Sequence, residues 1–155
     1  MTARLSSMSD AAYQAYMDGH LEDYARDRMK SDLATYEESL TRARDQRASL
    51  LPQGRKTAGH HFFEVKNGKG KDSEVVGHVW LFVEGARAWL YHVVIASTHR
   101  RRGFGRQAVE LAATRAQELG AQALGLNVFA DNPGAQALYR SLGFQTTSMH
   151  MIKAL

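Results

Sequence analysis

A basic turn in the second half of the chain combines residue types that can bind an anion. It holds arginines and glycines in the order Arg100, Arg101, Arg102, Gly103, Phe104, Gly105 and Arg106. A strand pattern precedes the turn and a helix pattern follows it, and a helix N-terminus attracts anions through unpaired N–H groups and its dipole. Gly103 lets a phosphate approach the backbone, and arginines add charge-assisted contacts. The turn favours a phosphorylated ligand; the alternative is a solvated basic turn.

Two other phosphate-binding motifs do not fit the chain. A Rossmann dinucleotide site needs three glycines in the order GxGxxG with an acidic residue about twenty positions on, and the segment from Gly120 to Gly125 contains no carboxylate. No Gly-Lys-Ser or Gly-Lys-Thr sequence occurs, so the P-loop pattern is absent.

A second segment with chemical potential runs from Asn127 to Phe144. Asn132 suits a helix N-cap and Pro133 suits the first helical position. Tyr139 follows seven residues after Asn132, which is about two helical turns, and its phenolic hydroxyl can donate a proton or a hydrogen bond. The alternative for Tyr139 is a tyrosine that packs between helix and sheet.

The elements that position these segments follow from the spacing of apolar residues. Helices are predicted over 9–30, with Ser9 as N-cap, and over 32–49, 104–119 and 134–142. Strands are predicted over 61–65, 75–83, 89–95, 123–129 and 145–154, with a weak extra strand over 4–7. The short connection at Gly85 indicates an antiparallel hairpin. This order predicts an α/β (mixed α+β) fold, a mixed sheet with helices on both faces.

Composition bounds the class of protein. The 155 residues fit a single domain, 1–155, and the formal net charge of +4 is concentrated in the basic turn. The chain has no cysteine, which excludes a disulfide scaffold, a thiol nucleophile and a Cys-based zinc site. The first ten residues have no apolar run typical of a signal peptide, and no apolar stretch is long enough to span a membrane, so we expect a cytoplasmic protein.

Together the two segments resemble the GNAT superfamily of N-acetyltransferases. Arg100-x-x-Gly103-x-Gly105 is similar to its pyrophosphate loop, and Asn132 through Tyr139 to Gly143-Phe144 is similar to its second motif. The resemblance covers roughly residues 74–155, and the tail from Met149 looks like a GNAT final strand. The first half is similar to small bacterial members of unassigned substrate. The resemblance implies a central, mostly antiparallel mixed sheet flanked by helices and acetyl-CoA as co-substrate.

The resemblance also implies roles for individual residues. The strand residues Val93, Val94 and Ile95 would pair with the pantetheine arm through their backbone, and the turn from Arg100 to Arg106 would hold the pyrophosphate. Asn132 would hydrogen-bond the pantetheine arm. Tyr139 would protonate the leaving thiolate, whose conjugate acid has a pKa of about 8.5.

The base that deprotonates the acceptor amine is less defined by sequence. Related proteins often carry a carboxylate on the strand before the loop, whereas residues 89–95 contain none. His92 stands at such a position, and an imidazole can act as base at neutral pH. A hairpin centred on Gly85 would place His78 directly opposite His92. Glu64 and Glu84 are weaker candidates, and proton transfer through water or a purely structural His92 are alternatives. Two histidines without a third ligand give no metal site.

The sequence therefore predicts an acetyl-CoA-dependent N-acetyltransferase that acts on a primary amine, with a small-molecule acceptor favoured. A protein lysine or N-terminus is an alternative acceptor, and a non-catalytic acyl-CoA-binding module is an alternative function. Nucleic-acid binding is disfavoured because the basic turn lacks interleaved aromatic residues and a broad basic face. No membrane partner is expected, and a homodimer is compatible with the family.

Overall fold

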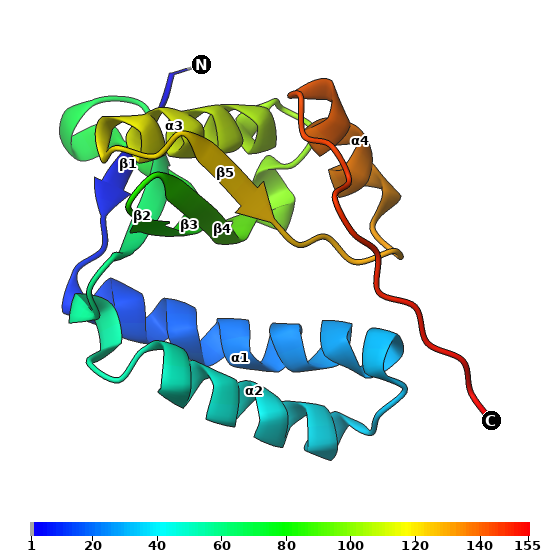
Figure 1. Cartoon of the computed structure of the whole chain (residues 1–155). Helices are drawn as coiled ribbons and strands as arrows, with labels where there is room; N and C mark the ends of the chain where they lie inside the picture. The colour runs from blue at the N-terminus through cyan, green and yellow to red at the C-terminus, as the bar shows by residue number, and fades with distance from the viewer. Residues whose placement is uncertain (1) are drawn as a thin grey trace. The chain divides into compact units, whose positions relative to one another are not determined.

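A computed structural model describes residues 2–155 of the chain (Figure 1). By its internal contacts the chain divides into two compact units. The first contains residues 2–13 and 53–127, and the second contains residues 14–52 and 128–155. The prediction of one domain over the whole chain stays a prediction.

The first unit is built on a five-stranded sheet. Its strands are β1 (Ala3–Ser7), β2 (His60–Asn67), β3 (Glu74–Glu84), β4 (Arg87–Ile95) and β5 (Ala123–Leu126). They lie side by side in chain order, β1 to β4 antiparallel and β5 parallel to β4. The predicted mixed, mostly antiparallel sheet is confirmed. The weak strand expected over 4–7 is β1, and the hairpin between β3 and β4 turns at Gly85-Ala86.

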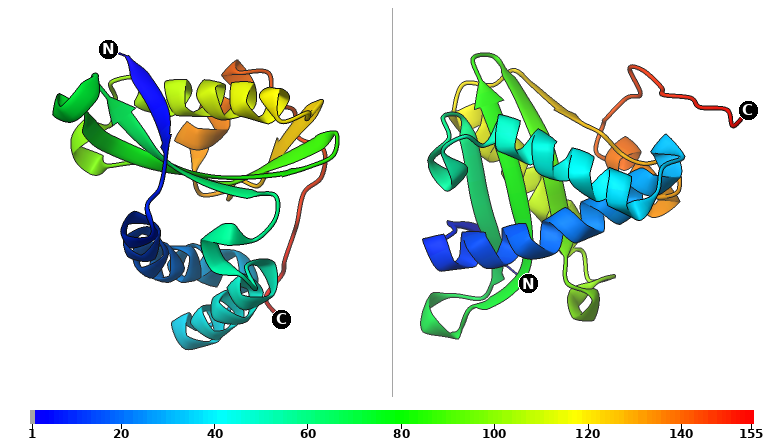
Figure 2. Two further views of the ribbon diagram at one scale, coloured as in Figure 1. Left: turned by 90° about the vertical axis from the view of Figure 1, so that its left-hand side faces the viewer. Right: turned by 90° about the horizontal axis from the view of Figure 1, so that it is seen from below.

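Helix α3 (Phe104–Glu118) and the first turn of the N-terminal helix pack on opposite faces of this sheet. Helix α3 packs along one face, where Phe104, Ala108 and Ala112 are buried (Figure 2). On the opposite face, the first turn of α1 (Asp10–Asp32) brings the ring of Tyr13 to 4.8 Å from that of Phe62. Successive buried residues of β2 and β3 therefore pack in two hydrophobic layers, one on each face of the sheet.

The second layer is rich in aromatic rings and includes a buried histidine. Trp80 Nε1 donates a hydrogen bond of 2.9 Å to His60 Nδ1, and His60 is 8% exposed. Burial lowers the pKa of His60, which keeps the imidazole neutral and able to accept this bond. The ring of Tyr91 stacks 4.8 Å from that of Trp80.

The second unit contains most of α1 together with α2 (Tyr36–Leu50) and α4 (Pro133–Ser141). Arg47 on α2 donates a hydrogen bond of 3.0 Å to the carbonyl oxygen of Met17 on α1. Helix α2 begins later than predicted, because Leu33 has a left-handed φ of 50° and the Thr35 side chain caps Glu38 N–H at 3.2 Å. The predicted start at residue 32 is therefore wrong.

Among the other predicted boundaries, three helix caps are confirmed and two strand predictions are wrong. Ser9 caps α1 by accepting from Ala12 N–H at 3.1 Å, and Gly120 and Gly143 end α3 and α4 with φ values of 101° and 93°. These three signals are confirmed. Strand β5 ends at Leu126 rather than at residue 129. No strand forms over 145–154, so the predicted final strand is wrong for this structure.

None of the helices in residues 2–155 combines the length and apolar character that crossing a membrane requires.

Candidate functional site

The basic turn and the residues just before it are held against the sheet by three contacts. Ala96 N–H donates to the carbonyl of Val76 at 2.8 Å, and a short helical turn, η3 (Ser97–His99), follows. His99 Nε2 lies 3.0 Å from Glu74 Oε1. Arg100 Nε donates to the carbonyl oxygen of Ile95 at 3.0 Å. The end of β4, β3 and the turn therefore form one connected structure, and Glu74 is a contributor that the sequence analysis did not identify.

Gly103 occupies the N-cap position of α3 and leaves the helix N-terminus open. Its backbone is left-handed, with φ 84° and ψ 3°, and no side chain caps the first N–H groups. A Cβ added to Gly103 would have Gln107 Nε2 at 4.0 Å as its nearest neighbour, so the space above the backbone is open. The predicted close approach of a ligand to this backbone is therefore sterically possible.

The arginines of the turn present positive charge to solvent. Arg100, Arg101, Arg102 and Arg106 are all exposed, and the first turn of α3 contains no acidic residue. Arg102 stacks 5.1 Å from the ring of Phe104, whose own side chain is buried and anchors the helix start. Arg106 lies 3.6 Å from Glu110, a weak exposed pair. Together with Gly103 and Gly105, these residues fit a pyrophosphate.

The sheet opens between β4 and β5 beside this turn. Pairing of β4 with β5 runs from Arg87 opposite Ala123 to Leu90 opposite Leu126 and stops there. Pairing of β4 with β3 continues to Ile95. In the described chain, the segment from Tyr91 to Ile95 therefore has a partner strand on one side only. Such an edge can pair with an extended ligand, as predicted for Val93, Val94 and Ile95. The carbonyl of Ile95 is already bonded to Arg100.

A β-bulge at Tyr91 changes the predicted histidine pairing. Leu81 lies opposite Leu90, but Trp80 lies opposite His92, so β4 carries one extra residue. His78 consequently pairs with Val94 and not with His92, and the predicted direct His78–His92 pair is wrong. Because paired residues share a face and alternate residues return to it, His78 and His92 still lie on the same face, diagonally across the two strands.

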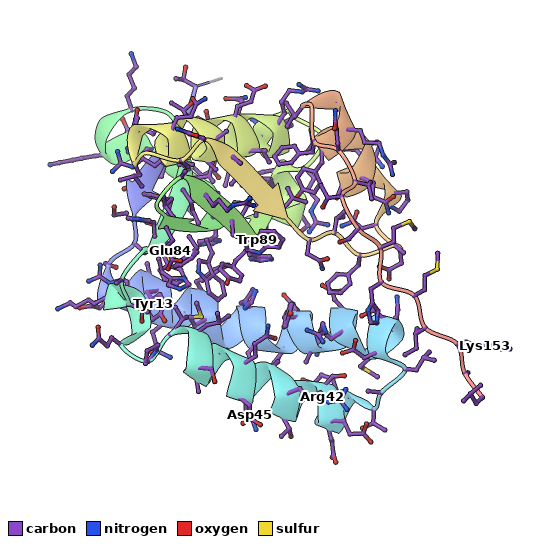
Figure 3. All side chains as sticks on the ribbon, viewed as in Figure 1. Tyr13, Arg42, Asp45, Glu84, Trp89 and Lys153 are labelled. Carbon is purple, nitrogen blue, oxygen red and sulfur yellow. The ribbon has the colours of Figure 1, made fainter. Side chains whose placement is uncertain are left out.

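The carboxylates considered as bases lie at different distances from this bulge. Glu64 on β2 stands directly opposite His78. Burial lowers the pKa of His78, and the negative charge of Glu64 partly offsets this by raising it. Glu84 lies at the hairpin end of β3, paired with Arg87, and is exposed (Figure 3). It is four residues from Trp80, the partner of His92, or about 13 Å along the strand. Glu64 is therefore better placed than Glu84 to influence the histidines. In residues 2–155, no three potential ligands gather as a metal site would require.

The remaining predicted residues, Asn132 and Tyr139, belong to the second unit. Asn132 Oδ1 accepts from Ala135 N–H at 3.2 Å and caps α4, so its amide nitrogen is the group left to donate to a ligand. Tyr139 is half-buried, its ring lies 5.6 Å edge-on to Phe144, and burial raises the pKa of its hydroxyl. The hydroxyl is thus protonated at neutral pH, as an acid must be.

Comparison with known proteins identifies the family. The sequence profile of the acetyltransferase (GNAT) family matches residues 21–144. The chain belongs to this family. YdgE, an uncharacterized N-acetyltransferase of Bacillus subtilis, is 28% identical over 159 residues that cover 100% of this chain and 99% of YdgE. The crystal structure of YycN from Bacillus subtilis matches 99% of each chain with a TM-score of 0.91 and 29% identity.

A more distant solved structure shares only the fold. It is an aminoglycoside N-acetyltransferase in complex with CoA, with a TM-score of 0.56 at 15% identity over 99% of this chain and 95% of its own. The family and fold predicted from the two motifs are confirmed, and the protein is an acetyltransferase. Members of the family transfer an acetyl group from acetyl-CoA.

Proposed function

We propose that this acetyltransferase binds acetyl-CoA along the open edge of β4 and the N-terminus of α3, and acetylates a primary amine on a small molecule. The observation that carries the proposal is the combination of two features in one unit. Strand β4 loses its β5 partner after Leu90, and the basic turn that follows leaves the start of α3 uncapped. The open edge of β4 suits the extended pantetheine arm of acetyl-CoA, and the uncapped start of α3 suits the diphosphate at the end of that arm.

The backbone and the side chains of the turn would bind the diphosphate in different ways. The N–H groups that follow Gly103 would bind it through the backbone, and the exposed guanidinium groups of Arg101, Arg102 and Arg106 would neutralise its charge. Arg100 would keep the turn in register with β4, since its Nε already bonds Ile95 and its other donors remain for the phosphates. Val93 and Val94 would pair with the arm, with Asn132 adding an amide donor.

Residues of the chain would then carry out two proton transfers, one from the acceptor amine and one to the leaving thiolate. Acetyl-CoA supplies a thioester, so the new C–N bond forms as the C–S bond breaks. The acceptor must lose a proton, because an alkylamine with a pKa of about 10.4 is charged at neutral pH. His92 at the bulge is our candidate to accept that proton, directly or through water, with His78 and Glu64 on the same face. Tyr139 would return a proton to the thiolate.

The acceptor side of β4 favours a compact molecule with an apolar part. Trp89 is 38% exposed, and its ring lies 6.5 Å edge-on to that of Tyr91, next to His92. Aromatic rings of this kind suit an amine attached to a flat or hydrophobic group. A protein lysine or N-terminus is the alternative acceptor.

An acceptor screen tests this assignment. Purified protein would be given acetyl-CoA with small aliphatic and aromatic amines, lysine peptides and peptides with free N-termini, and thiol release would be followed with Ellman's reagent. Because the chain has no cysteine, all of the thiol signal comes from CoA. We expect turnover and an acetylated product with small primary amines. Turnover confined to peptides, or no thiol release with any amine, would contradict the proposed acceptor class.

A further inference from the structure

The indole ring of Trp89 lies directly against the backbone of β5 at Gly125. Trp89 on β4 is the strand partner of Gly125. A Cβ added to Gly125 would stand 2.6 Å from Trp89 Cζ3 and 2.7 Å from Trp89 Cε3, well inside the separation at which carbon atoms pack. Gly125 does not have a left-handed φ, so its missing side chain serves this close approach and not an unusual backbone conformation. Any other residue here would push the indole away from the sheet.

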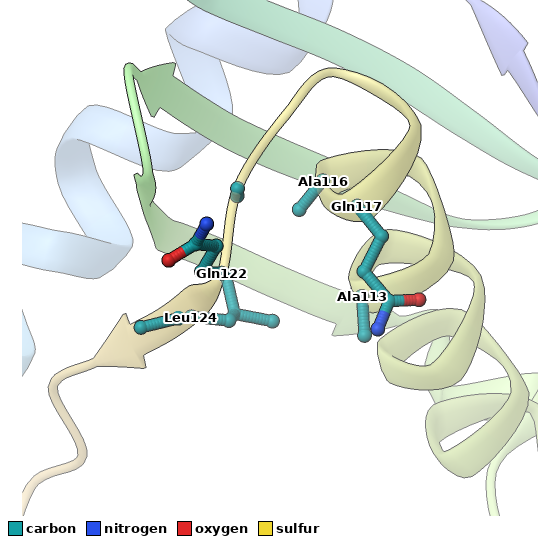
Figure 4. Close-up of a pocket in the computed structure, with 7 residues that line it drawn as sticks. Ala113, Ala116, Gln117, Gln122 and Leu124 are labelled. Carbon is teal, nitrogen blue, oxygen red and sulfur yellow. The ribbon is translucent and has the colours of Figure 1, made fainter.

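This indole lies on the face of the sheet opposite α3. Leu124, next to Gly125 in the chain, lines a small pocket of about 90 Å³ between β5 and α3 (Figure 4). Because successive side chains of a strand point to opposite faces, Gly125 and its partner Trp89 face away from α3. The candidate base His92 shares this face, since it pairs with Trp80 of the aromatic layer. The indole and the base are therefore on the same side of β4.

Aromatic rings continue along this face from Trp89 toward His92. Tyr91 lies edge-on to Trp89, with ring centroids 6.5 Å apart, and its other side stacks 4.8 Å from the ring of Trp80. Phe82, the strand partner of Trp89, lies 6.3 Å from Tyr91. Trp80 is buried and holds Tyr91 in place, whereas Trp89 is 38% exposed. We call the exposed indole of Trp89, with the ring of Tyr91 beside it, the Trp89 platform.

The Trp89 platform lies at a short, fixed distance from the candidate base. Trp89 and His92 are three residues apart, which is at most about 10 Å along a strand, and the bulge at Tyr91 shortens this span. A hydrogen bond to the imidazole covers about 3 Å of it, and an alkyl chain of about two or three carbons covers the remainder. The next pair on this face, Glu84 opposite Arg87, carries no net charge, which favours an uncharged ring over a second ammonium group.

We propose that the Trp89 platform is the acceptor subsite and stacks the aromatic ring of an arylalkylamine, a primary amine joined to a flat ring by a short alkyl chain. Aromatic rings prefer offset-stacked or edge-on neighbours, and Trp89 and Tyr91 offer both to one ligand ring. The amine loses a proton to the base and gains the acetyl group, and CoA takes up a proton and leaves as the thiol. Gly125 is a positioning residue that acts through Trp89. The inference rests on the proposed function, whose acceptor it names.

A pair of matched amines separates stacking from simple burial of apolar surface. 2-Phenylethylamine and 2-cyclohexylethylamine share one carbon skeleton and differ in whether the ring is flat, and thiol release from acetyl-CoA gives kcat/KM for each. We expect the phenyl-to-cyclohexyl ratio of kcat/KM to be about 3- to 10-fold higher in the wild type than in Trp89→Leu, through KM. Trp89→Phe, which keeps a flat ring, should retain most of the ratio. Because every variant meets the same two amines, their difference in basicity cancels.

Gly125→Ala tests the contact that positions the indole. Its new Cβ displaces the ring of Trp89, so the ratio should fall to that of Trp89→Leu, and Trp89→Leu/Gly125→Ala should lower it no further. Gly19→Ala, which adds a Cβ in open space on α1, should keep the wild-type ratio. General damage to the sheet would slow both amines alike and leave the ratio unchanged. Trp89→Leu answers the question by itself if Gly125→Ala does not fold.

The outcomes distinguish the Trp89 platform from the proposed function. Turnover of both amines at a ratio that Trp89→Leu leaves unchanged would overturn the platform, while acetylation of small primary amines would stand. Reaction of other small primary amines but of neither member of the pair would also overturn the platform alone. No thiol release with any small amine would overturn the proposed function, and the platform with it.

Discussion

Gly77 sits where β3 supports the end of β4, and replacing it by alanine perturbs the proposed pantetheine edge without touching a ligand. Gly77 is buried and lies opposite Ile95. A Cβ at this position would overlap the carbonyl oxygen of Val94 and would stand 2.7 Å from Ile95 Cδ1 and 3.2 Å from Ile95 Cα. Two of these three atoms belong to the backbone of β4, so a change of rotamer cannot relieve the overlap.

The size of the effect follows from these distances. Carbon atoms pack best at about 3.5–4.0 Å, so the end of β4 would move by about 1 Å. Overpacking of this kind costs about 1–3 kcal/mol in the free energy of unfolding. A displacement of about 1 Å in a binding strand can cost on the order of 10- to 100-fold in kcat/KM. Gly77→Ala should therefore lower both the melting temperature and kcat/KM for acetyl-CoA.

Thermal melting and steady-state kinetics, measured well below the melting temperature, separate the two effects. Gly19→Ala is the matched control, because a Cβ at Gly19 on α1 meets open space and alanine favours a helix. It should leave kcat/KM unchanged. If Gly77→Ala were less stable but bound and used acetyl-CoA as well as the wild type, the end of β4 would not be part of the site. Unchanged stability would show that the end of β4 accommodates a Cβ at position 77 without cost.

Three further predictions concern single side chains. Tyr139→Phe should lower kcat while leaving the Kd for acetyl-CoA within about twofold, since only the proton donor is removed; an unchanged kcat would exclude the acid role. His92→Ala should remove or shift the acid-side limb of the pH–rate profile, and an identical profile would assign the base elsewhere. His60 has a lowered pKa in the folded state, so the unfolded chain binds more protons and stability should fall as pH drops below about 6.5. His60→Phe should reduce the fall in melting temperature between pH 7.5 and 5.5, and an equal fall would show that other groups cause it.

The local structure around two groups of candidate site residues could be predicted from sequence because its signals are local. The turn from Arg100 to Gly105 and the cap at Asn132 each depend on a few adjacent residues whose backbone needs are specific, and both form as expected. The tight packing at Gly77 also has a sequence signal, because a glycine inside a strand indicates that another part of the backbone approaches closely.

Other features depend on contacts between distant segments and could not be predicted from the sequence. A bulge at Tyr91 shifts register by one residue, and nothing in the alternation of β4 marks it; the His78–His92 prediction failed for that reason. The contact between Glu74 and His99 joins residues from two elements that only the fold brings together. The tail has a strand pattern but no strand, because a strand forms only against a partner edge.

Calorimetric titration with acetyl-CoA tests most directly the claim that Gly103 and the basic turn hold the co-substrate. Three proteins are needed: the wild type, Gly103→Glu, and Gly70→Glu as the matched control. Gly70 also has a left-handed φ, 65° against 84° for Gly103, and open space around it, but it lies in the turn before β3. We expect binding by the wild type and Gly70→Glu and its loss in Gly103→Glu. Equal binding by all three, or none by the wild type, would contradict it.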